Sequence, residues 1–152
     1  MTHLSIWQQA GRLFFLLLLV FTIGYVGSGF MNMKTRLWYD ALIKSPMTPP
    51  GFVFPIVWTA LLFLQAIAAF IVWGKVSPRW FVVQLMLNMA WSFTFFYLHN
   101  PMAAFVISLL FSIAVFLNMI TFYGANKWAG ILIFPTFLWS LFAIYLNGYI
   151  VF

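Results

Sequence analysis

Residues 102–123 read MAAFVISLLFSIAVFLNMITFY, a stretch of 22 residues without Asp, Glu, Lys or Arg. A helix needs about 20 apolar residues to cross the hydrocarbon core of a bilayer, so this stretch predicts a transmembrane helix. Four further stretches have the same character: 13–31, 52–73, 80–98 and 128–152. The sequence therefore predicts an all-α membrane protein, a bundle of five transmembrane helices in one domain over residues 1–152.

The composition is that of a chain that lies almost wholly in a membrane. Hydrophobic residues make up 66% of its 152 residues and charged residues only 5%, whereas a soluble domain carries about 25% charged residues. The seven Lys and Arg side chains sit singly between apolar runs, which is typical of loop residues that meet lipid headgroups. No basic stripe is present to follow a phosphate backbone. We therefore expect membrane lipid as a partner and no nucleic acid.

One connection between the predicted spans is much longer than the others. Residues 32–51 hold four of the eight formally charged side chains, namely Lys34, Arg36, Asp40 and Lys44. Long loops in compact proteins are more often functional than idle, so we expect this loop to take part in the function. Near its end, Thr48 is predicted to cap the second span, with Pro49 or Pro50 in the first helical turn.

The basic residues give only a slight preference for one orientation. Four lie on the N-terminal side of the predicted bundle, Arg12, Lys75, Arg79 and Lys127, and three on the other side, Lys34, Arg36 and Lys44. Because cytoplasmic loops carry an excess of Lys and Arg, this split favours a cytoplasmic N-terminus. The cell membrane is the expected location.

Several kinds of chemistry have no residues to support them. No Asp, Glu, Lys or Arg lies inside the five predicted spans, which disfavours ion pumps and proton antiporters. Asp40 is the only acidic residue, so no pair of carboxylates is available for acid–base catalysis. Cysteine is absent, and His3 and His99 stand alone in the sequence. We therefore predict no metal site and no cofactor.

Aromatic side chains are what the spans offer instead. Trp58, Trp91 and Trp139 lie well inside predicted spans, and the first and last of them follow Pro55 and Pro135 by about one helical turn. The two prolines are predicted to kink the second and fifth spans, which would open an apolar cavity lined by aromatic faces. Packing of these aromatic rings inside the bundle is the alternative.

Polar and small residues in the spans predict contacts between helices. Five amide side chains lie within the spans: Gln65, Gln84, Asn88, Asn118 and Asn147. We expect them to form hydrogen bonds between helices, with ligand contact as the alternative. Gly24 and Ser28, four residues apart, would let another helix approach closely, either inside the bundle or from a second copy.

Five motifs follow one another along the chain. They are WYDAL at 38–42, TPP at 48–50, FPIVW at 54–58, QLxLNxxWS at 84–92 followed by Phe95 and Phe96, and PxxxWxxFAxxLN at 135–147. In content, order and spacing they resemble the TspO/MBR family, which includes tryptophan-rich sensory proteins, translocator proteins and peripheral-type benzodiazepine receptors. Met47 and Thr136 depart from the family pattern, which has Trp and Tyr at these positions.

The resemblance implies a five-helix protein that forms a homodimer and binds porphyrins, sterols or drug-like aromatic ligands. The pocket is expected inside the bundle, under the loop between the first two spans. By position its lining would be Tyr39, Pro50, Phe54, Trp58, Asn88, Trp91, Phe95, Trp139, Ala143 and Leu146. Some bacterial relatives degrade protoporphyrin IX in light, a reaction attributed to the tryptophans that match Trp58 and Trp139. The resemblance therefore makes these two the candidate catalytic residues.

The sequence thus favours a membrane-embedded binding protein for porphyrins, other tetrapyrroles and similar flat hydrophobic ligands, with a sensory or regulatory role. Indole faces suit a flat ring, and Lys34, Arg36 or Lys44 are predicted to meet the porphyrin propionates. Whether the protein is an enzyme is open, and at most slow photo-oxidative breakdown of protoporphyrin IX is expected. The alternatives are a transporter or shuttle of porphyrins or sterol-like lipids, and a non-enzymatic membrane scaffold.

Overall fold

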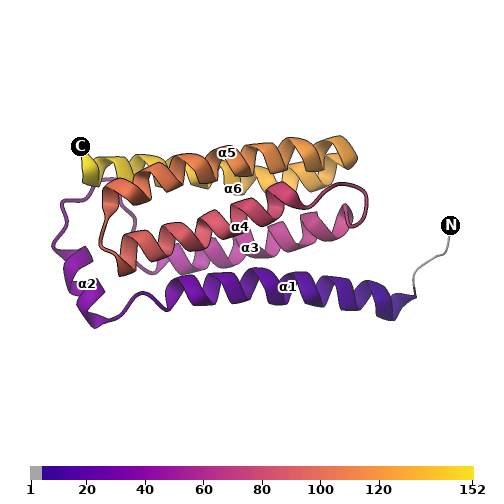
Figure 1. Cartoon of the computed structure of the whole chain (residues 1–152), viewed down its shortest axis with the longest axis horizontal. Helices are drawn as coiled ribbons and strands as arrows, with labels where there is room; N and C mark the ends of the chain where they lie inside the picture. The colour runs from indigo at the N-terminus through magenta and orange to yellow at the C-terminus, as the bar shows by residue number, and fades with distance from the viewer. Residues whose placement is uncertain (1–4) are drawn as a thin grey trace.

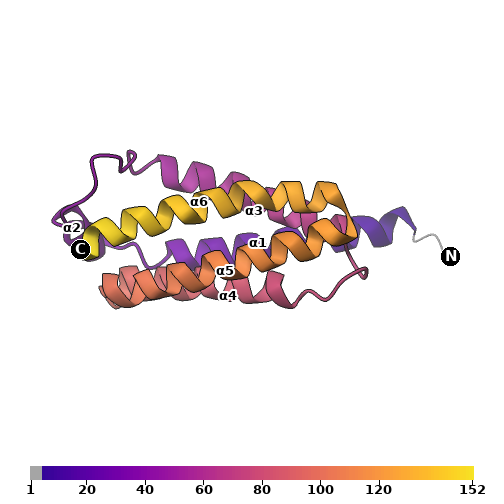
Figure 2. The same ribbon diagram turned by 90° about the horizontal axis from the view of Figure 1, so that it is seen from above.

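The computed structural model describes residues 5–152, and in this part of the chain every regular element is a helix. The elements are α1 (Ile6–Ser28), α2 (Met33–Asp40), α3 (Val53–Ile71), α4 (Arg79–Ser92), the π-helix η1 (Phe93–Tyr97), α5 (Pro101–Ala125) and α6 (Lys127–Val151). The long helices lie side by side, and the short α2 lies at the end of the bundle where α6 finishes (Figure 1). Figure 2 shows the same arrangement from above, with the start of α1 and the end of α6 at opposite ends.

Four of these helices are long and apolar enough to cross a membrane: α1, α3, α5 and α6. They correspond to four of the five predicted spans. The predicted span 80–98 is divided instead, because α4 ends at Ser92 and η1 carries the chain on to Tyr97. In η1 the Leu98 N–H donates to the carbonyl of Phe93, five residues back, at 3.1 Å. This wider turn ends the α-helical pattern inside the predicted span.

The first span and the long loop after it differ from their predicted bounds because of local capping. Helix α1 begins at Ile6, where the Gln8 N–H donates to the Ser5 hydroxyl and the Gln8 side chain accepts from the Ser5 N–H. It ends at Ser28 instead of residue 31. The loop contains α2, which begins where the Asn32 side chain accepts a hydrogen bond from the Thr35 N–H at 2.9 Å.

The predicted cap of the second span, Thr48, is wrong. Helix α3 begins at Val53 without a side-chain cap, and the Val53 N–H donates to the carbonyl of Pro50. Pro55 is then the third residue of the helix, within the first turn, where a backbone N–H has no partner inside the helix. Its missing donor therefore costs no hydrogen bond. Pro135, in contrast, lies in the interior of α6.

Gly24 and Gly27 of α1 pack inside the bundle, whereas Ser28, predicted to share the contact with Gly24, is exposed and its hydroxyl donates to the Tyr25 carbonyl at 2.8 Å. A Cβ atom added at Gly24 would lie 2.7 Å from Cδ1 of Leu62 in α3, and one added at Gly27 would lie 3.1 Å from the Ser92 hydroxyl of α4. Larger side chains at these two positions would push the helices apart. The glycines therefore let α1 approach both α3 and α4 closely.

Buried amides join three helices at the centre of the bundle. The Gln84 side chain of α4 donates to the Gln65 side chain of α3 at 2.9 Å, and Gln65 donates to the Thr136 hydroxyl of α6 at 3.2 Å. All three side chains are fully buried. This confirms the predicted contacts between helices for the two glutamines. Asn118 differs, because its amide is fully buried but has no hydrogen-bond partner among the described residues.

Helices α5 and α6 meet at a tight turn. The Asn126 N–H donates to the Phe122 carbonyl at the end of α5, and the Asn126 side chain accepts from the Trp128 N–H at 2.9 Å to start α6. One turn later Gly130 faces Tyr123, and a Cβ added at Gly130 would lie 2.7 Å from the Tyr123 Cα. Because backbone atoms cannot rotate away as a side chain can, only glycine fits this contact.

Replacing Gly130 with alanine is expected to destabilise the protein by about 1–3 kcal/mol, the usual cost of overpacking. Gly124→Ala is the matched control, since nothing lies within 4 Å of its added Cβ. Alanine in place of this helical glycine should be neutral or stabilising, by about 0.5–1 kcal/mol. The measurement is the midpoint of thermal unfolding in detergent, followed by circular dichroism. Equal midpoints for the two variants would contradict the close approach of α5 and α6.

Candidate functional site

Helix α2 is attached to the end of the bundle by polar and aromatic contacts. The hydroxyl of the buried Thr35 donates to the Phe96 carbonyl at 3.2 Å and lies 3.4 Å from Nε2 of His99. The Trp38 ring stacks on the His99 ring, with centroids 4.3 Å apart. His99 has a φ of 50°, in the left-handed region, and it lies in the turn between η1 and α5. Helix α2 is therefore held against the turn that follows η1.

Aromatic rings from α2, α4 and η1 pack together next to this contact. The Trp91 and Phe95 rings are stacked, with centroids 5.0 Å apart and planes 15° from parallel. Tyr39 meets both Phe95 and Phe96 edge to face at 6.2 Å, and Phe96 lies edge-on to Trp91 at 5.6 Å. We call Tyr39, Trp91, Phe95 and Phe96 the α2–η1 aromatic cluster. Three of the ten residues predicted to line the pocket, Tyr39, Trp91 and Phe95, are brought together in it.

Asn147 holds the largest ring of this cluster in place. The Trp91 indole N–H donates to the Asn147 side chain at 3.0 Å, and the Asn147 amide donates to the Pro101 carbonyl at 3.0 Å. Asn147 is buried in α6, so the indole is fixed from the neighbouring helix. The sequence predicted this amide as a contact between helices, with ligand contact as the alternative, and the contact between helices is confirmed. Asn147 could be recognised in the sequence because it is an amide residue within an apolar span. Nothing in the sequence indicated that its partner is Trp91.

A second aromatic group joins α3 and α6. The Phe54 and Trp139 rings lie 6.1 Å apart at an angle of 69°, and Trp139 also meets Phe142 at 5.4 Å. One turn farther along α6, the Tyr145 hydroxyl forms a 2.8 Å hydrogen bond with the hydroxyl of Ser45, which is buried in the loop after α2. The loop is thereby tied to α6 beside this group, and sequence reasoning did not identify either member of that bond.

The two candidate catalytic tryptophans have different neighbours. The Trp58 ring meets Phe111 of α5 at 6.2 Å and packs against the hydrophobic core. Trp139 meets Phe54 and Phe142 instead, and no ring contact joins the two indoles within the described part of the chain. The other predicted lining residues are Pro50, which is exposed, Asn88 and Ala143, which are half-buried, and Leu146, which is buried. Their contact with a ligand stays a prediction.

The basic residues of the loop differ in whether their charged groups are already hydrogen-bonded within the protein. The Lys44 ammonium donates to the carbonyls of Tyr39, Asp40 and Leu42 at 2.7, 3.1 and 3.1 Å, and it lies 4.7 Å from the centroid of the Tyr39 ring. Its three donors are therefore occupied by the end of α2. Lys34 and Arg36 are exposed on α2. These two side chains are the ones available to an anion at this end.

Tyr39 of α2 has a shifted pKa. Burial raises the pKa of its phenol above the usual value of 10.0, and the nearby Asp40 carboxylate raises it further. The phenol is therefore protonated at neutral pH and can donate a hydrogen bond. Within residues 5–152, no three His, Asp or Glu side chains come together as metal ligands. His3 lies outside the described residues.

Comparison with known proteins agrees with the sequence motifs. The profile of the TspO/MBR family matches residues 15–152. The chain is 38% identical to the tryptophan-rich protein TspO of Archaeoglobus fulgidus over 138 residues, covering 86% of this chain and 89% of the relative. It is 35% identical to the protein of the same name from Chlorobaculum tepidum over 85% of this chain and 87% of the relative. A tryptophan-rich sensory protein of Cereibacter sphaeroides is 32% identical, over 76% and 75%.

The extent of these matches and the four long apolar helices point to the same conclusion. The family profile covers nearly all of the chain, including every motif on which the resemblance was based. The chain is an integral, multi-pass membrane protein that belongs to the TspO/MBR family.

Proposed function

We propose that this protein binds porphyrins and similar flat hydrophobic ligands inside the membrane, at the α2 end of the bundle, in a sensory or regulatory role. The observation that carries the proposal is the stacked Trp91–Phe95 pair, because Asn147 fixes the indole before any ligand arrives. Aromatic side chains that are already held in place lose little conformational entropy when a flat ring stacks on them. The Phe54–Trp139 pair supplies a second aromatic wall, from α3 and α6.

We also propose that α4 and η1 together form a fifth membrane span. Helix α3 runs away from the α2 end of the bundle, and α5 starts again at that end (Figure 1). If both cross the bilayer, the chain between them must cross it in the opposite direction. Only residues 79–97, the combined length of α4 and η1, can make that crossing. The result is the five-span bundle expected for the family.

A shuttle for the same ligands is the main alternative. A receptor has to hold its ligand, whereas a shuttle must release it on both sides of the membrane. Protein-dependent movement of porphyrin across a liposome membrane would favour the shuttle, and binding without such movement would favour the receptor. We expect the protein to work as a homodimer in either case.

Trp139→Ala is expected to weaken the binding of protoporphyrin IX about tenfold, because it removes a ring from the proposed pocket. The control is Trp128→Ala, which removes an indole from the same helix at a site that is 70% exposed and at the opposite end of the bundle. The dissociation constants come from quenching of tryptophan fluorescence on titration. If both variants fold and lose equal affinity, Trp139 does not line the pocket.

Replacing Lys34 and Arg36 together with Gln is expected to weaken protoporphyrin IX more than its dimethyl ester, because the ester has no carboxylate to pair. Lys44→Gln is the matched control. Its ammonium holds three backbone carbonyls, so its loss should disturb the loop and weaken both ligands alike. The readout is the ratio of the two dissociation constants for each variant. An unchanged ratio in the Lys34/Arg36 variant would exclude ion pairing with the propionates.

Light-dependent breakdown of the porphyrin is proposed as a secondary activity. Indole is readily oxidised and can donate an electron to an excited porphyrin, whereas phenylalanine keeps an aromatic face without this property. We expect Trp139→Phe to slow bleaching of bound protoporphyrin IX in light more than Trp58→Phe, since Trp58 packs against the core and Phe111. Absorbance is followed in light, in the dark and in light without oxygen. If a variant with both Trp58→Phe and Trp139→Phe binds protoporphyrin IX as the wild type does and bleaches it at the wild-type rate, the protein binds the porphyrin without degrading it through these tryptophans.

A further inference from the structure

The end of the bundle opposite α2 carries positive charge without a matching negative charge. Four basic residues lie there: Arg12 near the start of α1, Lys75 and Arg79 around the α3–α4 turn, and Lys127 at the start of α6. The only acidic residue in the sequence, Asp40, ends α2 at the other end of the bundle (Figures 1 and 2). No Asp or Glu side chain can therefore pair with Arg12.

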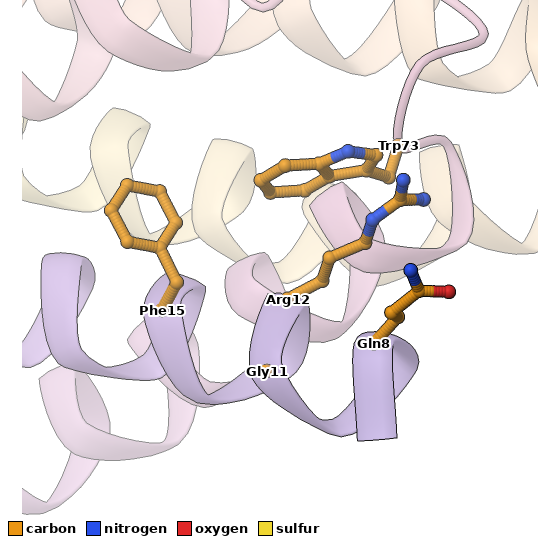
Figure 3. A pocket seen from close by; sticks show the side chains of 5 residues that line it. All are labelled: Gln8, Gly11, Arg12, Phe15 and Trp73. Carbon is orange, nitrogen blue, oxygen red and sulfur yellow. The ribbon is translucent and has the colours of Figure 1, made fainter. Parts of the chain in front are cut away.

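A hollow of about 480 Å³ lies at this end, between α1 and the end of α3. It is lined by Gln8, Gly11, Arg12, Phe15 and Trp73 (Figure 3). The Arg12 guanidinium carbon is 5.4 Å from the centroid of the Trp73 ring, and Phe15 meets the same indole edge to face at 6.2 Å. The cation is therefore held beside the two aromatic side chains that line the hollow.

The polar groups of the hollow suit an anion. A guanidinium stays charged at any pH relevant to proteins, and Arg12 is half-buried against Trp73, so it benefits from a counterion. The Gln8 carbonyl oxygen accepts from the Ser5 N–H at 2.9 Å, which leaves the amide NH₂ group as the free end of that side chain. The Arg12 guanidinium and the Gln8 NH₂ group both donate hydrogen bonds, which phosphate oxygens accept.

The apolar side chains of the hollow indicate that the anion also carries a hydrocarbon part. Arg12 directly precedes the apolar run that starts at Leu13, and Trp73 follows the last residue of α3 by two positions, so both belong at the level of the headgroups. Phe15 lies about one helical turn deeper. Gly11 leaves open space beside them, because nothing lies within 4 Å of a Cβ added there.

We propose that this hollow binds one anionic phospholipid, with the phosphate against Arg12 and Gln8 and an acyl chain against Phe15 and Trp73. The site is independent of the proposed porphyrin site, because it lies at the opposite end of the bundle. An occupant here bridges α1 and the end of α3. It also supplies the negative charge that this end of the protein lacks.

Native mass spectrometry of the purified protein, with phosphatidylglycerol or phosphatidylcholine of identical acyl chains, tests the proposal. Wild-type protein is expected to bind phosphatidylglycerol about tenfold more tightly, and Arg12→Gln is expected to remove that preference. Arg79→Gln is the matched control, since Arg79 also stacks on a tryptophan, Trp80, at 5.2 Å but lies outside the hollow. Gly11→Leu, which fills the open space and keeps all charges, is expected to weaken phosphatidylglycerol binding as well.

Three results would overturn the proposal. The first is equal binding of the two lipids by the wild-type protein, a comparison that depends on no variant. The second is an unchanged preference in Arg12→Gln, or an equal loss in Arg79→Gln, when circular dichroism shows both variants folded. The third is displacement of the lipid by an equal concentration of inorganic phosphate, which would make the hollow a small-anion site. Arg12→Lys, which keeps the charge, should retain part of the preference.

Discussion

Hydrocarbon offers no hydrogen-bond partner, and the rest of this structure depends on that constraint. Backbone polar groups in the membrane must be satisfied within helices, which is why the long apolar stretches form helices and not isolated strands. Because lipid is as apolar as leucine, burial of apolar side chains does not by itself hold those helices together. The two hydrogen bonds that link Gln84, Gln65 and Thr136 therefore contribute much to helix association. They join α4, α3 and α6 at buried positions, where water does not compete for the same groups.

Close helix approach adds van der Waals contact to these hydrogen bonds. Gly24 and Gly27 bring α1 onto α3 and α4, and Gly130 brings α6 onto α5. At the α2 end, the chain outside the long helices is fixed by contacts to its own backbone and to α6. Lys44 binds three carbonyls at the end of α2, and Ser45 bonds to Tyr145. The loop over the proposed pocket is thus an ordered cover, and its aromatic neighbours are positioned in advance of a ligand.

The two ends of the bundle present different side chains to their surroundings. The α2 end has aromatic rings, a protonated phenol at Tyr39 and exposed cations at Lys34 and Arg36, which together suit an aromatic ligand with acidic substituents. The opposite end has cations beside tryptophans, Arg12 with Trp73 and Arg79 with Trp80, which suits lipid headgroups. This asymmetry arises from where a few charged residues interrupt an otherwise apolar chain.

By itself the sequence determined the helical class and the places of the long helices, because length and apolar composition are local properties that a bilayer selects directly. It did not reveal α2, the π-helix η1 or the absence of a side-chain cap on α3, because these features depend on local turns and hydrogen bonds that differ little in energy over a few residues. The motifs predicted one aromatic site, yet only the tertiary structure showed that Trp58 and Trp139 have different neighbours and that Asn147 bonds to Trp91. Those pairings depend on how each helix is rotated about its axis, and that rotation is decided by packing against neighbours distant in sequence.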